Sequence, residues 1–235
     1  MTQLALPLRL ADHAVFASFF DRGNESLVAT LHDVARGIAD GAGCWLWGGA
    51  ATGKTHLLQA VCESAGDRSV YVPLSMFVEA GPLILDGLET RELVCIDDIE
   101  LIAGDPDWEA ALFALCNQLF DAGRQLVVAS KSAPRECPIQ LADLASRLSR
   151  LPVFRVHTLG DAERVEALQL RARHRGLDLP DDAAHYLLRR SRRDMASLYD
   201  LLDKLDLEAL RAKRRLTVPF VREVMQLYGG ASKPD

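Results

Sequence analysis

The chain has 235 residues, of which 49% are hydrophobic and 26% are charged, and its formal net charge is -6. These values are typical of a globular protein. They count against a disordered chain and against a general nucleic-acid coat, because phosphate binding needs a cationic surface. No apolar run approaches the ~20 residues of a membrane span, and no basic segment leads into a signal-peptide core. The sequence therefore predicts a cytoplasmic protein with no membrane partner.

Charge divides the chain into two parts. Residues 1–159 carry 12 basic and 20 acidic side chains, whereas residues 160–215 carry 13 basic and 11 acidic ones. An apolar run stops at the same place, near Leu159. We therefore expect two folded domains, 13–159 and 160–229, with short terminal segments at 1–12 and 230–235.

Before the boundary, short apolar runs alternate with amphipathic stretches. Near-continuous apolar runs indicate strands that are buried on both faces by helices. The best helical stretch is Asp107–Ala122, which has apolar residues at helical spacing after Pro106. This alternation predicts an α/β domain with a mostly parallel five-stranded sheet flanked by helices. The expected strands are Cys44–Trp47, Ser69–Leu74, Leu93–Ile96, Gln125–Ala129 and Val153–Thr158.

After the boundary the pattern is helical and shows no strand. Proline and acidic residues open two of the expected helices, and glycines follow the ends of two. The sequence predicts a small helical bundle there. Its expected helices are Asp161–His174, one from Asp181 to about Arg190, one from about Arg193 to Lys213, and one that Thr217 caps and that ends at Gly229.

A phosphate-binding loop follows the first expected strand. Gly48-Gly49-Ala50-Ala51-Thr52-Gly53-Lys54-Thr55 matches G-x-x-x-x-G-K-[ST] and precedes an expected helix. In this motif the glycines let backbone N–H groups turn toward the phosphates, and the helix N-terminus adds positive potential. Lys54 is predicted to reach the β- and γ-phosphates, and the Thr55 hydroxyl is predicted to hold Mg²⁺. We therefore expect Gly48, Gly49, Gly53, Lys54 and Thr55 to bind nucleotide.

Paired carboxylates end the third expected strand, Leu93-Val94-Cys95-Ile96-Asp97-Asp98. Phosphoryl-transfer proteins need one carboxylate near Mg²⁺ and often a second to orient the attacking water. We assign Asp97 to the metal, directly or through water, and Asp98 to the attacking water. Strand ends often carry aspartate, so the pair gains its meaning from the phosphate loop upstream.

These motifs together resemble the DnaA/Hda family of AAA+ ATPases. The resemblance spans about residues 14–228 and includes His56-Leu57-Leu58 after the phosphate loop and Asp97-Asp98-Ile99 at the strand end. The segments 143–148, 167–173 and 216–221 are also similar to the family. The resemblance implies an AAA+ α/β domain, a helical lid over residues 160–229, and an adenine nucleotide bound between the two, with His56 among the nucleotide-binding residues.

The resemblance also implies sites that spacing alone does not reveal. Arg147 matches the arginine finger, which projects toward the γ-phosphate held by a neighbouring subunit, and Arg150 is a possible companion. Arg193 lies where the lid carries its nucleotide-sensing arginine. The chain departs from the family at Lys131, where relatives place a polar or acidic sensing residue, so no sensing role is transferred to it.

The first residues, Gln3-Leu4-Ala5-Leu6-Pro7-Leu8, resemble the clamp-binding peptide of the same family. Gln3, Leu4, Leu6 and Leu8 would then dock in extended form on the sliding clamp, the beta subunit of DNA polymerase III. A terminal strand packed on its own domain is the alternative. The sequence shows neither the helix-turn-helix domain nor the helicase-recruiting domain of a DnaA initiator, so we do not expect an initiator.

The resemblance implies an AAA+ adaptor that binds the DNA-loaded clamp and stimulates hydrolysis of DnaA-bound ATP through Arg147, which prevents replication from re-initiating. Its implied ligands are ADP, favoured over ATP, and Mg²⁺. Contact with DNA would be indirect, through the clamp, and a homo-oligomer associated with the bacterial replisome is expected. The first alternative is a self-sufficient ATPase such as a DnaC-like helicase loader. The second is an origin-binding module that uses the arginines of the lid.

Overall fold

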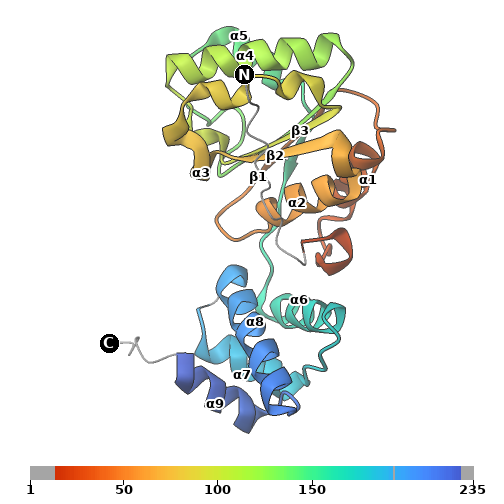
Figure 1. Ribbon diagram of the computed structural model, residues 1–235, viewed down its shortest axis with the longest axis vertical. Helices are drawn as coiled ribbons and strands as arrows, with labels where there is room; N and C mark the ends of the chain where they lie inside the picture. The colour runs from red at the N-terminus through yellow and green to blue at the C-terminus, as the bar shows by residue number, and fades with distance from the viewer. Residues whose placement is uncertain (1–13, 193, 229–235) are drawn as a thin grey trace. The chain divides into compact units, whose positions relative to one another are not determined.

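The computed structural model describes residues 14–192 and 194–228, which form two compact units (Figure 1). Unit 1 contains Gly23–Thr158 together with the described residues up to Phe16. Unit 2 contains the described chain from Leu159 onward and a second, separate segment, Ala17–Arg22. The sequence pattern gave no indication that this upstream segment lies with the helical part of the chain.

Unit 1 is built on a five-stranded sheet in the order β2-β3-β4-β1-β5. Every pairing is parallel, which confirms the predicted α/β class. Strands β1, β3 and β4 are almost entirely buried, as their continuous apolar runs predict. The strands are β1 (Gly43–Trp47), β2 (Ser69–Pro73), β3 (Leu93–Asp97), β4 (Gln125–Ser130) and β5 (Val153–Arg155).

Helices cover both faces of this sheet. In Figure 1, α1 and α2 lie on one side of the strands, and α4 and α5 lie on the other. Alternate strand residues such as Trp45 and Ile96 pack with α4 residues such as Leu112 in one core cluster. Burying one such side chain contributes about 1.5–3 kcal/mol. The helices are α1 (Glu25–Arg36), α2 (Lys54–Ala65), α3 (Leu74–Phe77), α4 (Pro106–Asp121) and α5 (Ala142–Leu148).

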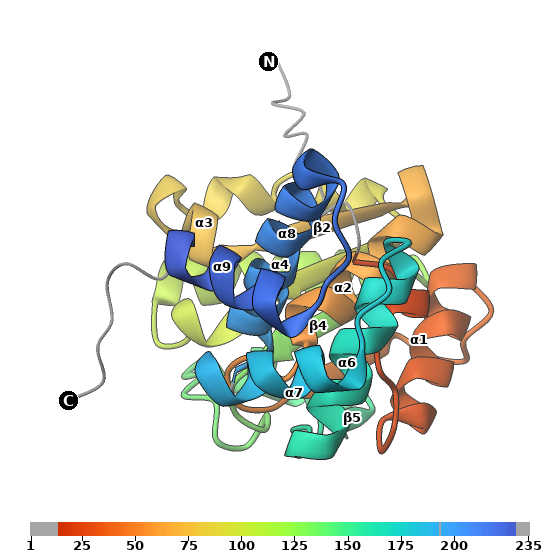
Figure 2. The same cartoon turned by 90° about the horizontal axis from the view of Figure 1, so that it is seen from below.

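Unit 2 is a helical bundle with a core of its own, as the sequence predicted. Helix α6 contacts α7 and α8, and α9 contacts the same two helices. Figure 2 shows these helices gathered together. Phe20, from the upstream segment, packs against this core, and Arg22 pairs with Glu166 of α6 at 2.8 Å. The helices are α6 (Asp161–His174), α7 (Asp181–Arg190), α8 (Met195–Ala212) and α9 (Val218–Tyr228).

All five cysteines are free and buried, so they serve as small apolar side chains of the core. Burial raises the pKa of the Cys44 and Cys116 thiols to about 12, far from the range of a reactive thiolate. Among the described residues, no helix is long and apolar enough to cross a membrane.

Candidate nucleotide site

The phosphate loop joins β1 to α2 and turns sharply where its glycines lie. Gly53 has a φ of 99°, a left-handed conformation that suits glycine, and it is directly followed by the first residue of α2. At Gly48 a Cβ atom would lie 2.8 Å from the carbonyl oxygen of Val156, so only glycine fits there. The loop therefore has the strand–loop–helix setting that phosphate binding requires.

Lys54 bends back over its own loop. Its Nζ donates hydrogen bonds to the carbonyl oxygens of Gly48 at 2.7 Å and Gly49 at 2.8 Å, and the residue is 7% exposed. Burial lowers the pKa of this ammonium, while the nearby carboxylates Asp97 and Glu100 act in the opposite direction. The cation is thus held at the mouth of the loop, where an anionic ligand would compensate its charge.

Asp97 and Thr55 come from different elements and meet at the carboxyl edge of the sheet. The Thr55 hydroxyl donates to Asp97 Oδ2 at 2.7 Å, and the hydroxyl of Tyr71 in β2 donates to the same oxygen at 3.0 Å. Asp97 is 1% exposed, and this burial raises the pKa of its carboxyl although the three hydrogen bonds that it accepts oppose the shift. Sequence reasoning found Asp97 and Thr55 but missed Tyr71, which belongs to no motif.

These residues fit a nucleotide-bound Mg²⁺. A hydroxyl and a carboxylate oxygen 2.7 Å apart are hard oxygen ligands of the kind that this ion prefers. Among the described residues, no group of three His, Cys, Asp or Glu side chains is placed to hold a metal. An ion at Thr55 and Asp97 would therefore take its remaining ligands from phosphate oxygens and water.

Asp98 and Lys131 also lie at this edge of the sheet. Asp98 has a φ of 59°, and its backbone N–H donates to Asp97 Oδ1 at 3.1 Å. Lys131 follows β4, and its Nζ lies 3.3 Å from Glu100 Oε1. Its backbone N–H also donates to Glu100. Lys131, which departs from the family pattern, thus has an acidic partner in Glu100. The sequence could have suggested this pair, because Glu100 follows the end of β3 and Lys131 follows the end of its neighbour β4.

His56 lies in the first turn of α2 but its ring faces the residues before α1. Its Nε2 is 2.9 Å from the carbonyl oxygen of Val15. The structure therefore brings the phosphate-loop helix together with the start of unit 1.

Arg147 is placed near the end of α5, and its side chain is half-buried. Its guanidinium makes no hydrogen bond or ion pair within the described part of the chain. It does lie close enough to Cys116 of α4 to lower the pKa of that thiol against the larger effect of burial. Arg150 is exposed, and its backbone N–H donates to Arg147 O at 3.2 Å.

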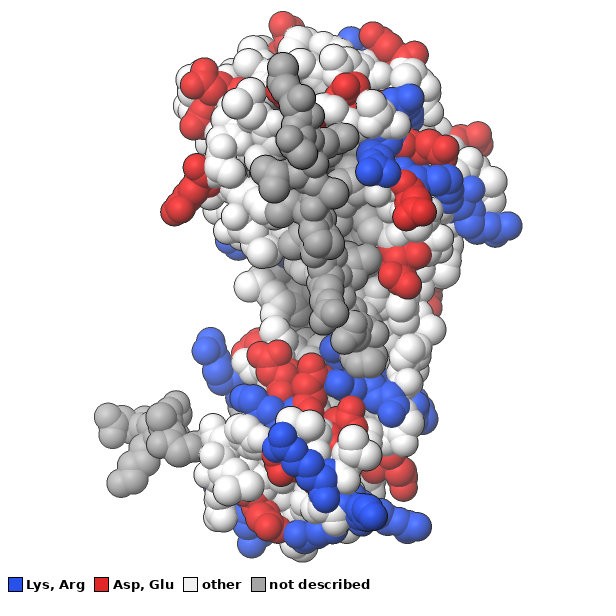
Figure 3. Space-filling view, in the orientation of Figure 1, with Lys and Arg blue, Asp and Glu red and all other residues white. Residues whose placement is uncertain are grey.

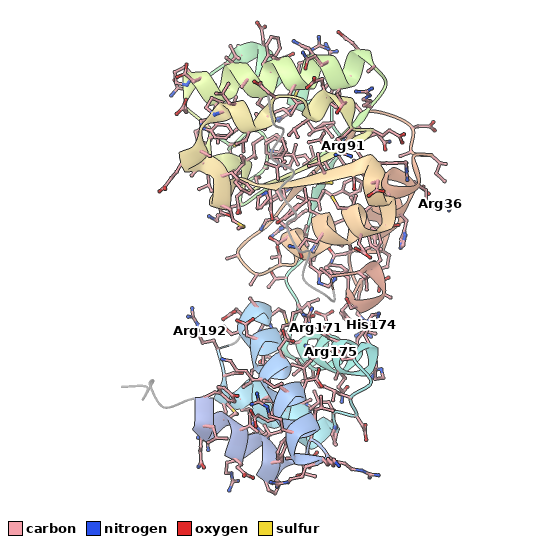
Figure 4. The ribbon with its side chains drawn as sticks, in the orientation of Figure 1. Arg36, Arg91, Arg171, His174, Arg175 and Arg192 are labelled. Carbon is pink, nitrogen blue, oxygen red and sulfur yellow. The ribbon has the colours of Figure 1, made fainter. Side chains whose placement is uncertain are left out.

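In unit 2 half of the described arginines are paired with acids, namely Arg22, Arg164, Arg175, Arg192, Arg211 and Arg214. Figure 4 labels Arg171 on α6 and Arg175 directly after the end of that helix; Arg175 forms ion pairs with Asp203 and Asp206 of α8. Arg171 is 8% exposed and lies over the ring of Tyr199 at 4.3 Å. On the face shown in Figure 3, basic and acidic side chains of this unit are interspersed.

Some predicted site residues lie outside the described residues. These are the sensing arginine of the lid and the clamp-binding side chains, namely Arg193, Gln3, Leu4, Leu6 and Leu8.

Comparison with protein families gives two matches. Residues 86–152 match the model of the bacterial DnaA ATPase domain, and residues 161–225 match the model of the Hda lid domain. The first match contains Asp97, Asp98 and Arg147, and the second covers most of unit 2.

Solved structures give the same fold. Domain III of the Thermotoga maritima replication initiation protein DnaA is 19% identical, with a TM-score of 0.77 over 92% of this chain and 97% of that one. AMPPCP-bound DnaA from Aquifex aeolicus is 19% identical, with a TM-score of 0.66 over 86% of this chain and 68% of that one. The Holliday junction branch migration motor RuvB of Thermotoga maritima is 17% identical, with a TM-score of 0.63 over 88% and 68%. At these identities the likeness shows the fold.

A parallel sheet with a complete phosphate loop, an acidic strand end and a separate helical bundle defines an AAA+ protein. The two family matches narrow this class. The chain belongs to the DnaA/Hda family, with a DnaA-type ATPase segment and an Hda-type lid.

Proposed function

We propose that this protein is an AAA+ adaptor that promotes hydrolysis of DnaA-bound ATP by presenting Arg147 to it. The observation that carries the proposal is the state of Arg147, whose guanidinium is unpaired within the described chain although it lies half-buried on a helix. Burying part of a cation without a counter-ion is costly, so such a side chain is poised for an anionic partner. The guanidinium stays charged and spreads its donors over the charge that develops on a transferring phosphoryl group.

The family match of the lid favours the role of a regulator rather than that of an initiator. Residues 161–225 match the Hda lid model, whereas the ATPase segment matches DnaA. AAA+ subunits of like fold can complete one another's sites when an arginine of one reaches the phosphates of the next. DnaA is therefore the proposed partner, and the outcome is conversion of DnaA to its ADP form and suppression of re-initiation.

The protein's own nucleotide site serves to hold the adaptor in its working form. Lys54 and the loop N–H groups would bind the phosphates of an adenine nucleotide, ADP in preference to ATP, and Thr55 with Asp97 would hold Mg²⁺. His56 and Arg193 are proposed to complete this site. Bound Mg²⁺ supplies positive charge against the phosphates.

The clamp is the proposed anchor of the adaptor on DNA. Residues Gln3, Leu4, Leu6 and Leu8 would dock on the beta subunit of DNA polymerase III in extended form, so that contact with DNA is indirect. The adaptor is also proposed to form a homo-oligomer, because AAA+ subunits can associate so that an arginine of one reaches the phosphates of the next.

The test is a reconstitution with DnaA–ATP, clamp loaded on DNA, and this protein, in which hydrolysis of DnaA-bound ATP is followed. We expect rapid hydrolysis in the complete mixture and slow hydrolysis when any one component is left out. Full activity without the clamp would refute the proposed role of the clamp. Hydrolysis at the basal rate in the complete mixture would refute the proposal that this protein is an adaptor.

A self-sufficient ATPase, such as a helicase loader, is the second candidate. It is favoured by the contact of Thr55 with Asp97 and by the adjacent Asp98, which together provide the groups that hydrolysis needs. Turnover of ATP by the purified protein alone, abolished by Lys54→Ala, would establish it. An origin-binding module that uses Arg189, Arg190, Arg192 and Arg193 is disfavoured, because residues 160–215 carry only 13 basic side chains against 11 acidic ones.

A further inference from the structure

Glu109 is a buried carboxylate that binds only backbone N–H groups within the described chain. It lies in the first turn of α4 and is 2% exposed. One oxygen accepts from Gly104 N at 2.7 Å, and the other accepts from Leu141 N at 2.6 Å. Gln140 N donates to both oxygens, at 3.0 and 3.1 Å. One side chain therefore joins the turn before α4 to the residues that lead into α5.

Helix α5 has no capping side chain of its own. Leu141 is its N-cap residue and makes no side-chain cap hydrogen bond. An N-terminus of this kind leaves backbone N–H groups that need partners. The carboxylate of Glu109 supplies a partner for the last two N–H groups before the helix, and its negative charge suits a helix N-terminus. The position at which α5 begins is thus fixed by a residue 32 positions earlier in the chain.

The turn before α4 reinforces this connection. Gly104 has a φ of +90°, and a Cβ atom there would lie 3.4 Å from Gln140 Nε2. The turn at Gly104 therefore lies close to the Gln140 side chain, and both segments donate backbone N–H groups to the same carboxylate. Burial on its own would raise the pKa of Glu109, but the N–H groups of Gly104, Gln140 and Leu141 outweigh it and lower the pKa. The group is ionised at neutral pH, and its bonds are charge-assisted.

Helix α5 also carries Arg147, whose neighbours Leu144 and Leu148 are buried in the core. We infer that Glu109 is a positioning residue for Arg147, holding α5 so that the guanidinium projects at a fixed place. This inference rests on the proposed function of Arg147. A displacement of about 1 Å in a catalytic group can lower a rate by roughly 100-fold, so a loosened α5 would be costly even if the protein stayed folded.

The experiment compares Glu109→Gln with Asp107→Asn. Both changes remove one negative charge from the first turn of α4, but Asp107 is exposed and only Glu109 bonds to the start of α5. We expect Glu109→Gln to lower Arg147-dependent hydrolysis of DnaA-bound ATP by about tenfold or more, within the range of a ~1 Å misplacement, and to leave nucleotide binding by this protein unchanged. Amide hydrogen exchange should become faster in the peptide that contains residues 138–148. Asp107→Asn should behave as the wild type in all three measurements.

A double mutant separates positioning from general damage. In an Arg147→Ala background, Glu109→Gln should cause no further loss, because the residue acts through Arg147. An equal loss in both backgrounds, or a loss of nucleotide binding, would overturn the inference. If Glu109→Gln hydrolyses DnaA-bound ATP at the wild-type rate while Arg147→Ala is slower, only the inference about Glu109 is overturned. If Arg147→Ala itself has the wild-type rate, the proposed function is overturned.

Leu141→Pro provides a second variant that keeps the carboxylate. Leu141 has a φ of -73°, which proline adopts, and proline removes the N–H that donates to Glu109. We expect a loss of stimulated hydrolysis in the same direction as for Glu109→Gln. Unchanged hydrolysis and unchanged exchange in this variant would count against Glu109 as the residue that holds α5.

Discussion

Lys54 and Asp97 are ionisable side chains that are buried in the folded protein. Burial lowers the pKa of the Lys54 ammonium and raises the pKa of the Asp97 carboxyl, so each charge is held at a cost. Phosphate would compensate the first charge and Mg²⁺ the second. Binding of nucleotide and Mg²⁺ would therefore offset part of the free energy that burial of these two charges costs.

Lys54→Ala tests this account. The ammonium donates to two loop carbonyl groups here and is free to turn to a phosphate when one binds. Hydrogen bonds to charged groups contribute about 1.5–3 kcal/mol, so nucleotide affinity should fall by roughly 10- to 150-fold. Titration calorimetry with ADP and ATP measures it. Lys204→Ala, in unit 2, is the control, and equal affinity in wild type and Lys54→Ala would exclude the phosphate loop as the binding site.

Arg147→Ala is predicted to separate activity from folding. Since the guanidinium has no hydrogen bond or ion pair within the described chain, its loss should leave the melting temperature and nucleotide binding nearly unchanged. Hydrolysis on DnaA should fall by about 10³-fold or more, the scale for removal of an arginine finger. Arg147→Lys should restore little, because lysine lacks the planar set of donors. A stable Arg147→Ala protein with wild-type activity would refute the mechanism.

Which residues of the site could be predicted depended on whether a motif contained them. Lys54, Thr55 and Asp97 were predictable because each lies at a fixed place in a motif next to a strand end. Tyr71 and Glu109 were not, since each acts through a partner far away in the sequence and nothing local distinguishes it from an ordinary core tyrosine or helix glutamate.

At the scale of elements, the predicted strands are all present and differ from the structure mainly at their ends. The last predicted strand, Val153–Thr158, is observed only as Val153–Arg155. Within the described part of the chain this edge strand pairs only with β1, whose last residue Trp47 is paired with Arg155, so the ladder stops there. Helix α8 begins at Met195 rather than about Arg193, because Asp194 is its N-cap and accepts from Ser197 N at 2.8 Å. Caps of this kind shift a boundary that periodicity alone cannot fix.

The connection between α4 and α5 gives the protein a defined response to acid. The pKa of Glu109 lies below its ordinary value of 4.5, so its stabilising bonds are complete above pH 4.5 and are lost as the pH falls through the lower folded-state value. At neutral pH, Glu109→Gln should lower the free energy of unfolding by about 1–3 kcal/mol. The difference from wild type should narrow in acid. Urea unfolding over a pH series measures this, and a difference independent of pH would show that the charge is not involved.

At the scale of the whole molecule, the chain divides into two units of different architecture. Unit 1 contains the phosphate loop, the acidic strand end and Arg147, while unit 2 has its own hydrophobic core. Composition and periodicity predicted both parts, because an α/β pattern and a helical pattern follow one another along the chain. The upstream segment Ala17–Arg22 escaped prediction, since six residues carry too little periodicity to be assigned to either part.

The proposed clamp anchor makes a prediction for the assembled system. Replacing Gln3, Leu6 and Leu8 together by alanine should abolish clamp binding and, with it, stimulated hydrolysis on DnaA, because the amide and both apolar anchors of an extended peptide are lost. Nucleotide binding by the protein should be retained, since Lys54 and its loop are unchanged. Surface plasmon resonance on immobilised clamp gives the first readout. Loss of hydrolysis with clamp affinity intact would assign these residues a different role.

Because Ala17–Arg22 belongs to unit 2, the lid cannot be separated from the rest of the protein by a single cut in the chain. A fragment begun at residue 160 would lack Phe20, which packs on the core, and Arg22, which pairs with Glu166. Its apolar surface at that place would be left uncovered. The lid is therefore not a module that recombination can exchange by cutting once between two domains. An expression fragment of the lid needs both pieces, residues 17–22 as well as the chain from Leu159 onward.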